Sequence, residues 1–425
     1  MAFSPLFRFA LGVLATSTYI LSGPNGKAQP RESLAGEAAA KALKESLEAE
    51  QQQYNLRYGP VNLQTGAKLT FGYTDNVFYS DKNRRDDLLI NPEVQLAALC
   101  QVSELNKLRL SLGIGYEYYV KNSGLNGDAP LINPESELVF LIFAGDFRIK
   151  LHEKFFYQES LFFNSIPGSH DLFFNFNDVG RFGRWDNLAG FNVDWDLDKL
   201  ILSASFDHED FVSTTARFDY LDRSSEWLTA SGTFLIGDKA KTGVEAQASL
   251  HDYGKESVLS DNWRARVGPF VEVKPQEKIS LRAGVGYDTA QYEATAEDSD
   301  FDTYYAYGSV SQETRLFTHS LTAGREHSLG DNANNLRTTY VRYSISSPVV
   351  NHVELGANAS VNFAEEFGGA FKEDFTYYVA GFRAGYQFHK YWHADLGYEF
   401  LLKNSDLSLR DFYRDRVTCT VGFRF

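Results

Sequence analysis

Hydrophobic and polar side chains alternate with a period of two along most of the chain after Val61. In residues 107–120, leucine, isoleucine, tyrosine and valine occupy every second position, and mainly charged residues, serine and glycine lie between them. Successive side chains of a β-strand point to opposite faces of the sheet, so this pattern predicts a strand with one apolar and one polar face. The same alternation recurs over 353–363, 380–388 and 392–400.

Segments of this kind are numerous enough to predict a large sheet. We expect eighteen antiparallel strands, an even number of the sort that single-chain bacterial barrels have. Their expected bounds are 61–73, 87–102, 107–120, 136–143, 146–157, 187–197, 199–208, 225–236, 241–252, 262–274, 278–290, 302–313, 317–326, 337–347, 352–363, 375–388, 391–402 and 413–425.

The connections between these segments alternate in length. Those after even-numbered strands are short, for example Ser103–Asn106, Leu197–Asp198, Gly237–Ala240, Pro275–Glu277 and His389–Lys390. Those after odd-numbered strands are longer and polar, and include 74–86, 121–135, 158–186, 209–224, 291–301, 364–374 and 403–412. A transmembrane barrel has short turns at its periplasmic end and long loops outside. A soluble sandwich has no reason to sustain this asymmetry over so many hairpins.

The tryptophans lie at the ends of predicted strands. Trp185, Trp227 and Trp263 lie on the long-loop side, and Trp195 and Trp392 lie on the turn side. Amphipathic rings at both membrane interfaces form the aromatic girdles of a barrel. This placement favours lipid, and not a second sheet, as the neighbour of the apolar face.

The last predicted strand continues to the end of the chain, where Phe423 and Phe425 share its apolar face. An aromatic terminus on an amphipathic strand resembles the signal read by the outer-membrane barrel assembly machinery. We therefore expect Phe423 and Phe425 to act in assembly, with that machinery as a partner. The expected fold class is all-β: a transmembrane antiparallel β-barrel in the lipid of the cell outer membrane, with a short N-terminal helix.

The first 28 residues have the features of a secretory signal peptide. Arg8 is followed by a short apolar run over Phe9–Leu21, and Gly26-Lys27-Ala28 offers small residues for cleavage. An uncleaved anchor helix is the alternative, but the run is shorter than the roughly 20 apolar residues of a spanning helix. Residues 61–425 then form the barrel.

Residues 29–60 differ in composition from everything after them. Glu37–Glu45 is rich in strong helix formers with charges at helical spacing, so we expect one exposed periplasmic helix and a linker. This segment is either a solvated tether, or a part that plugs the barrel or binds a periplasmic partner.

Composition supports β structure and excludes two other classes. The chain has 24 tyrosines, 34 phenylalanines and 33 glycines but a single methionine. A net charge of −15 with no basic patch argues against nucleic-acid binding. A mean hydropathy of −0.33 argues against a helical membrane protein.

We expect Cys100 and Cys419 to remain unpaired, because the first strand separates them in a closed barrel.

Signatures of catalysis are absent from the sequence. It has no Gly-x-Ser-x-Gly, no His-Glu-x-x-His and no phosphate-binding loop, and its nine histidines lack metal-ligand spacing. His208-Glu209-Asp210 is interpreted as a solvated rim cluster, with a surface hydrolase site as the alternative. We expect no enzyme activity, no cofactor and no metal.

The inward polar face carries both signs of charge in nearly equal number, as a lumen wall would. The pore-lining candidates are Arg109, Glu117, Arg148, Lys150, Glu245, Arg264, Arg266, Arg282, Arg342, Glu354, Arg383 and Glu399. Among them, Arg264, Arg266 and Arg282 are expected to form a basic stripe that Glu245 and Glu272 partly neutralise. Paired charges in a filled barrel are the structural alternative, but eighteen strands favour an open channel.

The longest connection, 158–186, is the candidate for an inward constriction loop. Its aromatic and basic side chains suit contact with small sugars or anions; the candidates are Phe173, Phe174, Phe176, Arg181 and Arg184. The expected function is passive diffusion of small hydrophilic solutes. The alternative is a barrel component of exopolysaccharide export or envelope assembly that acts with periplasmic partners.

One hairpin resembles a known family. Gly72-Tyr73-Thr74-Asp75-Asn76-Val77-Phe78, followed by Asp86-Asp87 and Asn91-Pro92, is similar to the opening of outer-membrane barrels of the "beta-barrel porin 2" group. The resemblance implies a porin-like barrel of a group sometimes associated with exopolysaccharide export. It covers this hairpin specifically and identifies no substrate.

Overall fold

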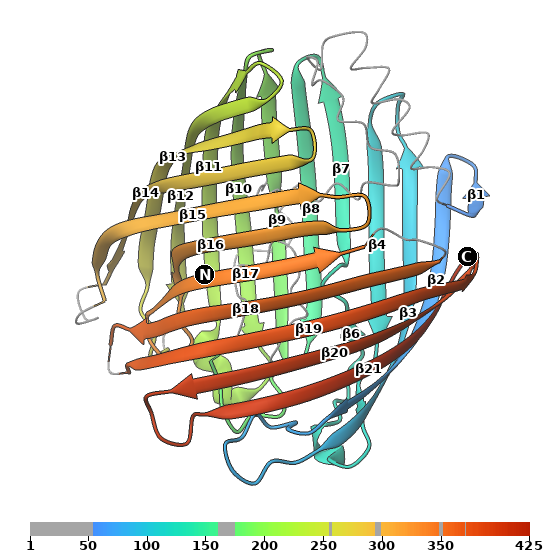
Figure 1. Ribbon diagram of the computed structural model, residues 1–425, viewed down its shortest axis with the longest axis vertical. Coiled ribbons are helices and arrows are strands. Elements are labelled where there is room, and N and C mark those ends of the chain that lie inside the picture. Colours follow the sequence, from blue (N-terminus) through green and yellow to red (C-terminus); the bar gives the residue numbers. More distant parts are fainter. Residues whose placement is uncertain (1–53, 160–174, 255–256, 294–298, 348–351, 370) are drawn as a thin grey trace, which may run out of the picture.

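The computed structural model describes residues 54–159, 175–254, 257–293, 299–347, 352–369 and 371–425. They form a closed antiparallel β-barrel of eighteen long strands, shown in Figure 1, in which each strand pairs with its neighbours in the sequence. The last strand, β21 (Phe412–Arg424), pairs with β2 (Val61–Thr74) and closes the barrel. The predicted fold class and strand number are therefore confirmed. The predicted helix within 29–60 and the signal peptide lie outside the described residues.

The other long strands lie close to the predicted bounds. They are β3 (Asp87–Gln101), β4 (Lys107–Gly115), β7 (Glu137–Ala144), β8 (Phe147–Gln158), β9 (Arg184–Asp196), β10 (Leu200–Ser213), β11 (Arg223–Ile236), β12 (Ala240–Tyr253), β13 (Asn262–Gln276), β14 (Ile279–Tyr292), β15 (Phe301–Glu313), β16 (Thr318–Leu329), β17 (Asn335–Ser346), β18 (Val353–Phe367), β19 (Glu373–His389) and β20 (Trp392–Ser405). The short strands β1 (Leu56–Tyr58), β5 (Tyr118–Tyr119) and β6 (Leu131–Ile132) and the 3-10 helices η1 (Ser123–Leu125) and η2 (Ala216–Leu221) complete the described elements.

The outward face of the barrel is apolar and exposed. Leu228, Val244, Val285 and Leu396 are each more than half exposed, although such side chains are normally buried in a water-soluble protein. Their sequence neighbours on the other face are glycines, Trp227 and polar residues such as Glu245 and Asp395. A continuous apolar outer surface is stable in lipid and not in water.

The two ends of the barrel differ, as the connection lengths predict. At the turn end, β7 and β8 are joined by two residues, as are β13 and β14, and β19 and β20. At the loop end, the connections are longer and contain η1 and η2. Among the described residues, no helix is long and apolar enough to cross a membrane.

The predicted strand 107–120 is divided in two. β4 ends at Gly115, and β5 resumes the pairing with β3 in the same register, with Glu93 opposite Gly115 and Ile90 opposite Tyr118. Pro92 lies between these pairs and has no N–H to donate, although its carbonyl still accepts a hydrogen bond from Tyr116. The proline therefore interrupts the ladder without changing its register.

The prediction that Trp227 belongs to an outer girdle is wrong. Trp227 is paired with Ser249 on the inward face, and its indole N–H donates to Glu209 at 3.0 Å. Its neighbour Leu228 is the outward residue, 55% exposed. The other four tryptophans, Trp185, Trp195, Trp263 and Trp392, are exposed on the outer surface.

Both cysteines are free in the structure. Cys100 pairs with Val61 and Cys419 with Phe71, on opposite sides of β2. Ten residues along one strand correspond to about 33 Å. This separation agrees with the prediction that the two thiols cannot form a disulfide.

Deleting Phe425 is expected to block assembly. The Phe425 backbone exchanges two hydrogen bonds of 2.7 Å with Thr65 across the seam between the last and first long strands, and its ring lies 5.4 Å from that of Tyr391. The truncated chain should remain in a protease-sensitive form, measured by digestion of intact cells and by detergent-gel mobility without boiling. Phe388→Asp is the control, because Phe388 is an outward aromatic, 50% exposed, away from the terminus. Normal assembly of the truncated chain would contradict the expected role of Phe425.

Candidate functional site

The inward face of the wall is a series of ion pairs. On the side formed by β4, β7 and β8, Glu137 accepts contacts from Arg109 at 3.5 Å and from Lys150 at 3.0 Å. On the adjacent strands, Arg148 pairs with the buried Asp194. These predicted basic residues lie together on one wall with acidic partners, so their charges largely cancel locally.

The opposite wall, formed by β12–β15, contains the predicted arginine stripe. Arg282 is bound by Glu245 at 3.1 Å and lies 3.8 Å from Glu272. Arg264 and Arg266 instead lie over aromatic rings, at 5.4 Å from the Phe301 centroid and 5.8 Å from the Tyr305 centroid. Within the part of the chain that the structure describes, neither arginine has an acidic partner, and Nη2 of Arg264 makes no hydrogen bond.

Lumen-facing aromatic rings on this wall lie over glycines of the neighbouring strands. A Cβ built on Gly284 would come within 2.7 Å of three atoms of the Tyr307 ring and hydroxyl, and one on Gly324 would come within 2.9 Å of Tyr340. Glycine is required here because only a hydrogen atom fits beneath the ring. The rings consequently lie along the wall instead of projecting across the lumen. Tyr307 also donates to Glu245 and accepts from Arg282.

The remaining pore-lining candidates are distributed around the barrel. Arg342 stacks on Tyr340, with its guanidinium 3.9 Å from the ring centroid. Arg383 binds Asp395 at 2.8 Å nearer the turn end, where Glu354 is an exposed residue of β18. Glu399 pairs with Arg414 near the loop end, and Glu117 lies between β4 and β5.

The described part of the predicted constriction loop lies across the loop end of the barrel. We call residues 175–183 the crossing segment; the chain enters β9 directly after it. At its start it contacts the far wall, where Asn175 donates to Glu366 of β18 and to Glu373 of β19, each at 2.7 Å. Further along, Val179 donates to the Phe78 carbonyl in the first long loop. The barrel is therefore spanned at this end by its own chain.

Apolar side chains of the crossing segment form a core inside the mouth of the barrel. Phe176, Val179 and Phe182 are buried and pack in one cluster with residues of other loops and of the outer strand ends. The other members of this cluster are Tyr79, Phe211, Phe218, Leu221, Tyr253, Leu259, Ala364, Phe375, Tyr377, Leu401 and Phe412. Burial of this apolar surface holds the loops inward over the lumen.

The predicted loop residues have different positions. Phe176 belongs to the apolar cluster, and Arg181 pairs with Glu159 at 2.5 Å. Arg184 is the first residue of β9 and is fully buried. Phe173 and Phe174 lie outside the described residues.

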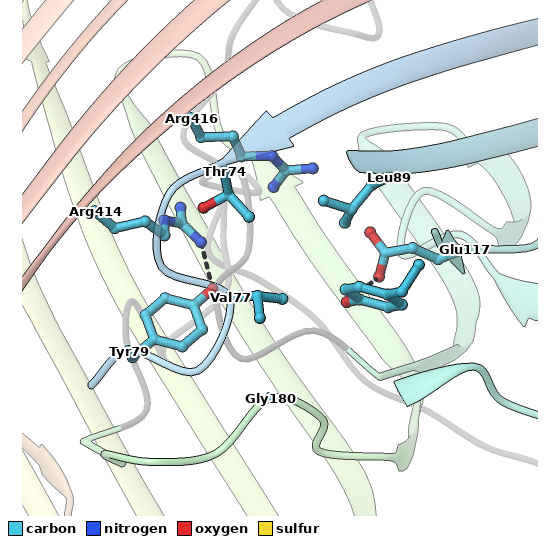
Figure 2. A pocket seen from close by; sticks show the side chains of 9 residues that line it. Thr74, Val77, Tyr79, Leu89, Glu117, Gly180, Arg414 and Arg416 are labelled. Carbon is cyan, nitrogen blue, oxygen red and sulfur yellow. Dashed lines mark hydrogen bonds between the residues drawn. The ribbon is translucent and has the colours of Figure 1, made fainter. Parts of the chain in front are cut away.

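A small hollow lies beside the crossing segment, between the apolar cluster just described and a second one formed by Val77, Leu89 and Tyr119. Figure 2 shows its lining, with Arg414 and Arg416 on one side, Glu117 and Leu89 on the other, and Gly180 of the crossing segment below. The hollow thus combines apolar surface with charges of both signs.

The two arginines of the hollow differ in their contacts. Arg414 is buried and donates to Glu399 and to the Tyr79 hydroxyl. Arg416 lies directly opposite Glu399 in the ladder, but Glu399 is already paired with Arg414. Nε of Arg416 is buried without a hydrogen-bond partner among the described residues. One donor of this guanidinium is therefore unused among the described residues.

Burial raises the pKa of the Tyr79 hydroxyl, and the adjacent Arg414 guanidinium offsets part of that rise. Tyr79 consequently stays neutral at physiological pH and accepts the hydrogen bond of Arg414 without adding negative charge to the hollow.

Sequence reasoning did not select Arg414 and Tyr79 as candidates. Arg414 has the same strand parity as Arg416, so alternation counted back from Phe425 identifies it as inward. No comparable signal exists for Tyr79, whose position depends on loop packing. Among the described residues, no group of three or more histidine, cysteine or acidic side chains is arranged to hold a metal ion.

No family model matches the chain, and no curated protein matches it in sequence. The specific resemblance to the "beta-barrel porin 2" group therefore stays a prediction.

Solved structures do match the fold. One is a BenF-like porin from Pseudomonas fluorescens Pf-5, with a TM-score of 0.52 and 10% identity over 86% of this chain and 99% of that one. Another is OccK2 (OpdF) of Pseudomonas aeruginosa in complex with glucuronate, with a TM-score of 0.50 and 9% identity over 86% and 98%. The chain thus has the fold of outer-membrane porins with eighteen strands.

Proposed function

We propose that this protein is a porin-like channel of the cell outer membrane that allows passive diffusion of small hydrophilic solutes. The observation that carries the proposal is the wall of the barrel: it is apolar outside and charged inside, and it leads to the hollow of mixed polarity beside the crossing segment. A barrel of this strand number is wide enough for an aqueous channel. The similarity in fold to porins supports the same function.

We further propose that the channel favours anions or anionic sugars. Most lumen arginines and lysines have acidic partners, whereas Arg264, Arg266 and Arg416 have none within the described ranges. Uncompensated positive charge along a narrow pore raises the local concentration of anions. The OccK2 structure contains glucuronate, which makes a sugar acid a suitable first probe for this chain.

The two ends of the chain fit this proposal as export and assembly devices. Residues 1–28 would direct export and then be removed, and 29–60 would remain in the periplasm ahead of the barrel. Phe423 and Phe425 would be read by the barrel assembly machinery.

Liposome swelling tests the proposed function. Vesicles that contain the purified, heat-modifiable barrel should swell in solutions of small sugars, and the rate should fall as sugar size increases. The alternative, a component of polysaccharide export that acts with periplasmic partners, predicts a barrel that is closed when alone. Absence of swelling with correctly folded protein would therefore favour the alternative.

A further inference from the structure

The crossing segment is anchored to the far wall through a single asparagine. Every polar atom of Asn175 is used. Its side-chain amide donates to Glu366 and Glu373, and its side-chain oxygen accepts from Lys403 at 2.5 Å. Its backbone N–H donates to Asp331 at 2.7 Å, and its carbonyl accepts from Asn332 at 2.9 Å and Arg410 at 2.7 Å.

These contacts come from parts of the chain that are distant in sequence. β18, β19 and β20 each contribute one of the side chains that bind the amide, and two further loops supply the backbone contacts. We call this set the Asn175 network; its members are Asn175, Asp331, Asn332, Glu366, Glu373, Lys403 and Arg410. Glu366, Glu373 and Lys403 are fully buried, so water does not replace a contact that is lost.

The charges make the network specific for an asparagine. Two buried carboxylates point at the amide nitrogen, and a buried ammonium group points at the amide oxygen. A side chain that donates on one side and accepts on the other is therefore required. An aspartate of the same shape would place a third carboxylate against two others.

From this geometry we infer that Asn175 is the positioning residue of the constriction: it fixes the crossing segment across the lumen and so sets the size limit of the channel. The inference rests on the proposed function, because a size limit has meaning only for an open channel. Asn175 does not line the hollow itself; it acts through Gly180 and the apolar side chains that follow it in the segment.

The test uses Asn175→Asp in the full-length protein, with Asn192→Asp as the matched control. Asn192 is a buried asparagine of β9 whose amide bonds to Asp194 within the wall, so its substitution also adds a carboxylate next to an acid but leaves the crossing segment untouched. Single-channel conductance should rise about 2-fold or more in Asn175→Asp, because a wider pore conducts more and admits larger sugars. It should stay near the wild-type value in Asn192→Asp.

Adding Glu366→Gln to Asn175→Asp should bring the conductance back toward the wild-type value, although Glu373 still faces the introduced aspartate. The side-chain oxygen of the introduced glutamine can still accept from the Asp331 and Asn332 amides, as Oε1 of Glu366 does at 2.8 and 3.2 Å. Its new NH₂ group can donate to the aspartate, which reverses the polarity of that hydrogen bond, at the cost of the bond that Oε2 of Glu366 accepts from the Asn332 side chain at 3.0 Å. If Asn175→Asp raised the conductance by unfolding part of the barrel, the second substitution would not lower it again.

The outcomes separate this inference from the proposed function. If the wild-type protein conducts and Asn175→Asp has the same conductance, the inference is overturned and the channel proposal stays intact. A closed wild type that opens in Asn175→Asp supports the anchor and overturns passive diffusion. If Asn175→Asp does not reach the heat-modifiable state, Asn175→Ala replaces it in the same measurement. Failure of both variants to fold overturns the positioning role, because Asn175 is then a folding determinant.

Discussion

Replacing Arg264, Arg266 and Arg282 together by serine should reverse the ion selectivity of the channel. Two of the three have no acidic partner among the described residues, and the third neutralises Glu245 and contacts Glu272. The triple variant therefore loses three positive charges and leaves Glu245 without its arginine, whereas Glu272 keeps its ion pair with Lys241 at 2.9 Å. The reversal potential across a salt gradient should change sign from anion-selective to cation-selective. The effect should weaken as salt rises, since the screening length falls from about 10 Å at 0.1 M to about 3 Å at 1 M.

The control for this variant is Arg325→Ser. Arg325 lies 4.9 Å from the ring centroid of Tyr304, an aromatic that is 53% exposed on the outer surface, so its removal changes net charge without changing the lumen. Arg282→Ser alone shows the effect of uncovering Glu245, and Arg264→Ser/Arg266→Ser shows the effect of losing the two unpaired arginines. Unchanged selectivity in the triple variant would mean that ions do not pass along this wall.

The barrel could be predicted from sequence because its determinants are local. The period-two alternation identifies each strand, and the length of each connection identifies which end of the barrel it joins. Parity and the hairpin at 275–277 also bring Arg282 near Glu272, which lies directly opposite it in the ladder. Each of these inferences uses only residues of the same hairpin or of the next one along the chain.

The mouth could not be predicted in the same way, because it depends on contacts between distant residues. Asn175 and Glu366 are 191 positions apart, and nothing in the sequence near either one indicates the other. The crossing segment follows a stretch with no alternation, so its path is decided by the apolar surface it can bury and by the polar partners it meets.

Trp227 is an exception to the rule that the apolar side chains of a membrane barrel face the lipid. Near the loop end the inside of the barrel is partly filled by protein, so an aromatic side chain is as stable there as in lipid. The ring of Trp227 packs at 5.0 Å against that of His251, and its indole N–H has an acceptor in Glu209. The same reasoning applies to Tyr305 and Tyr340, buried rings of the inner wall.

Lys403→Met should loosen the mouth of the barrel strongly. Lys403 is fully buried and pairs with the equally buried Glu373 at 2.6 Å. Removal of Lys403 leaves the buried Glu373 with Arg410, at 2.9 Å, as its remaining cationic partner, so the cost should approach the roughly 3–5 kcal/mol of a broken buried ion pair without reaching its upper end. The temperature at which the barrel loses its heat-modifiable form should fall, and protease should cleave the 158–186 loop in folded protein. Both can be read from detergent gels of heated and digested samples.

A second substitution distinguishes an unpaired charge from simple loss of packing. In Lys403→Met/Glu373→Leu both charges are absent, and a buried ion pair replaced by apolar side chains of similar volume is often close to neutral in stability. Arg410, the other cationic partner of Glu373, is 21% exposed and can be hydrated instead. The double variant should therefore recover most of the thermal stability. In the double variant Asn175 keeps Glu366 but loses Lys403 and Glu373. The resistance of this variant to protease should therefore recover less than its melting temperature. Equal recovery of both would show that the ion pair, and not the contacts of Asn175, fixes the crossing segment.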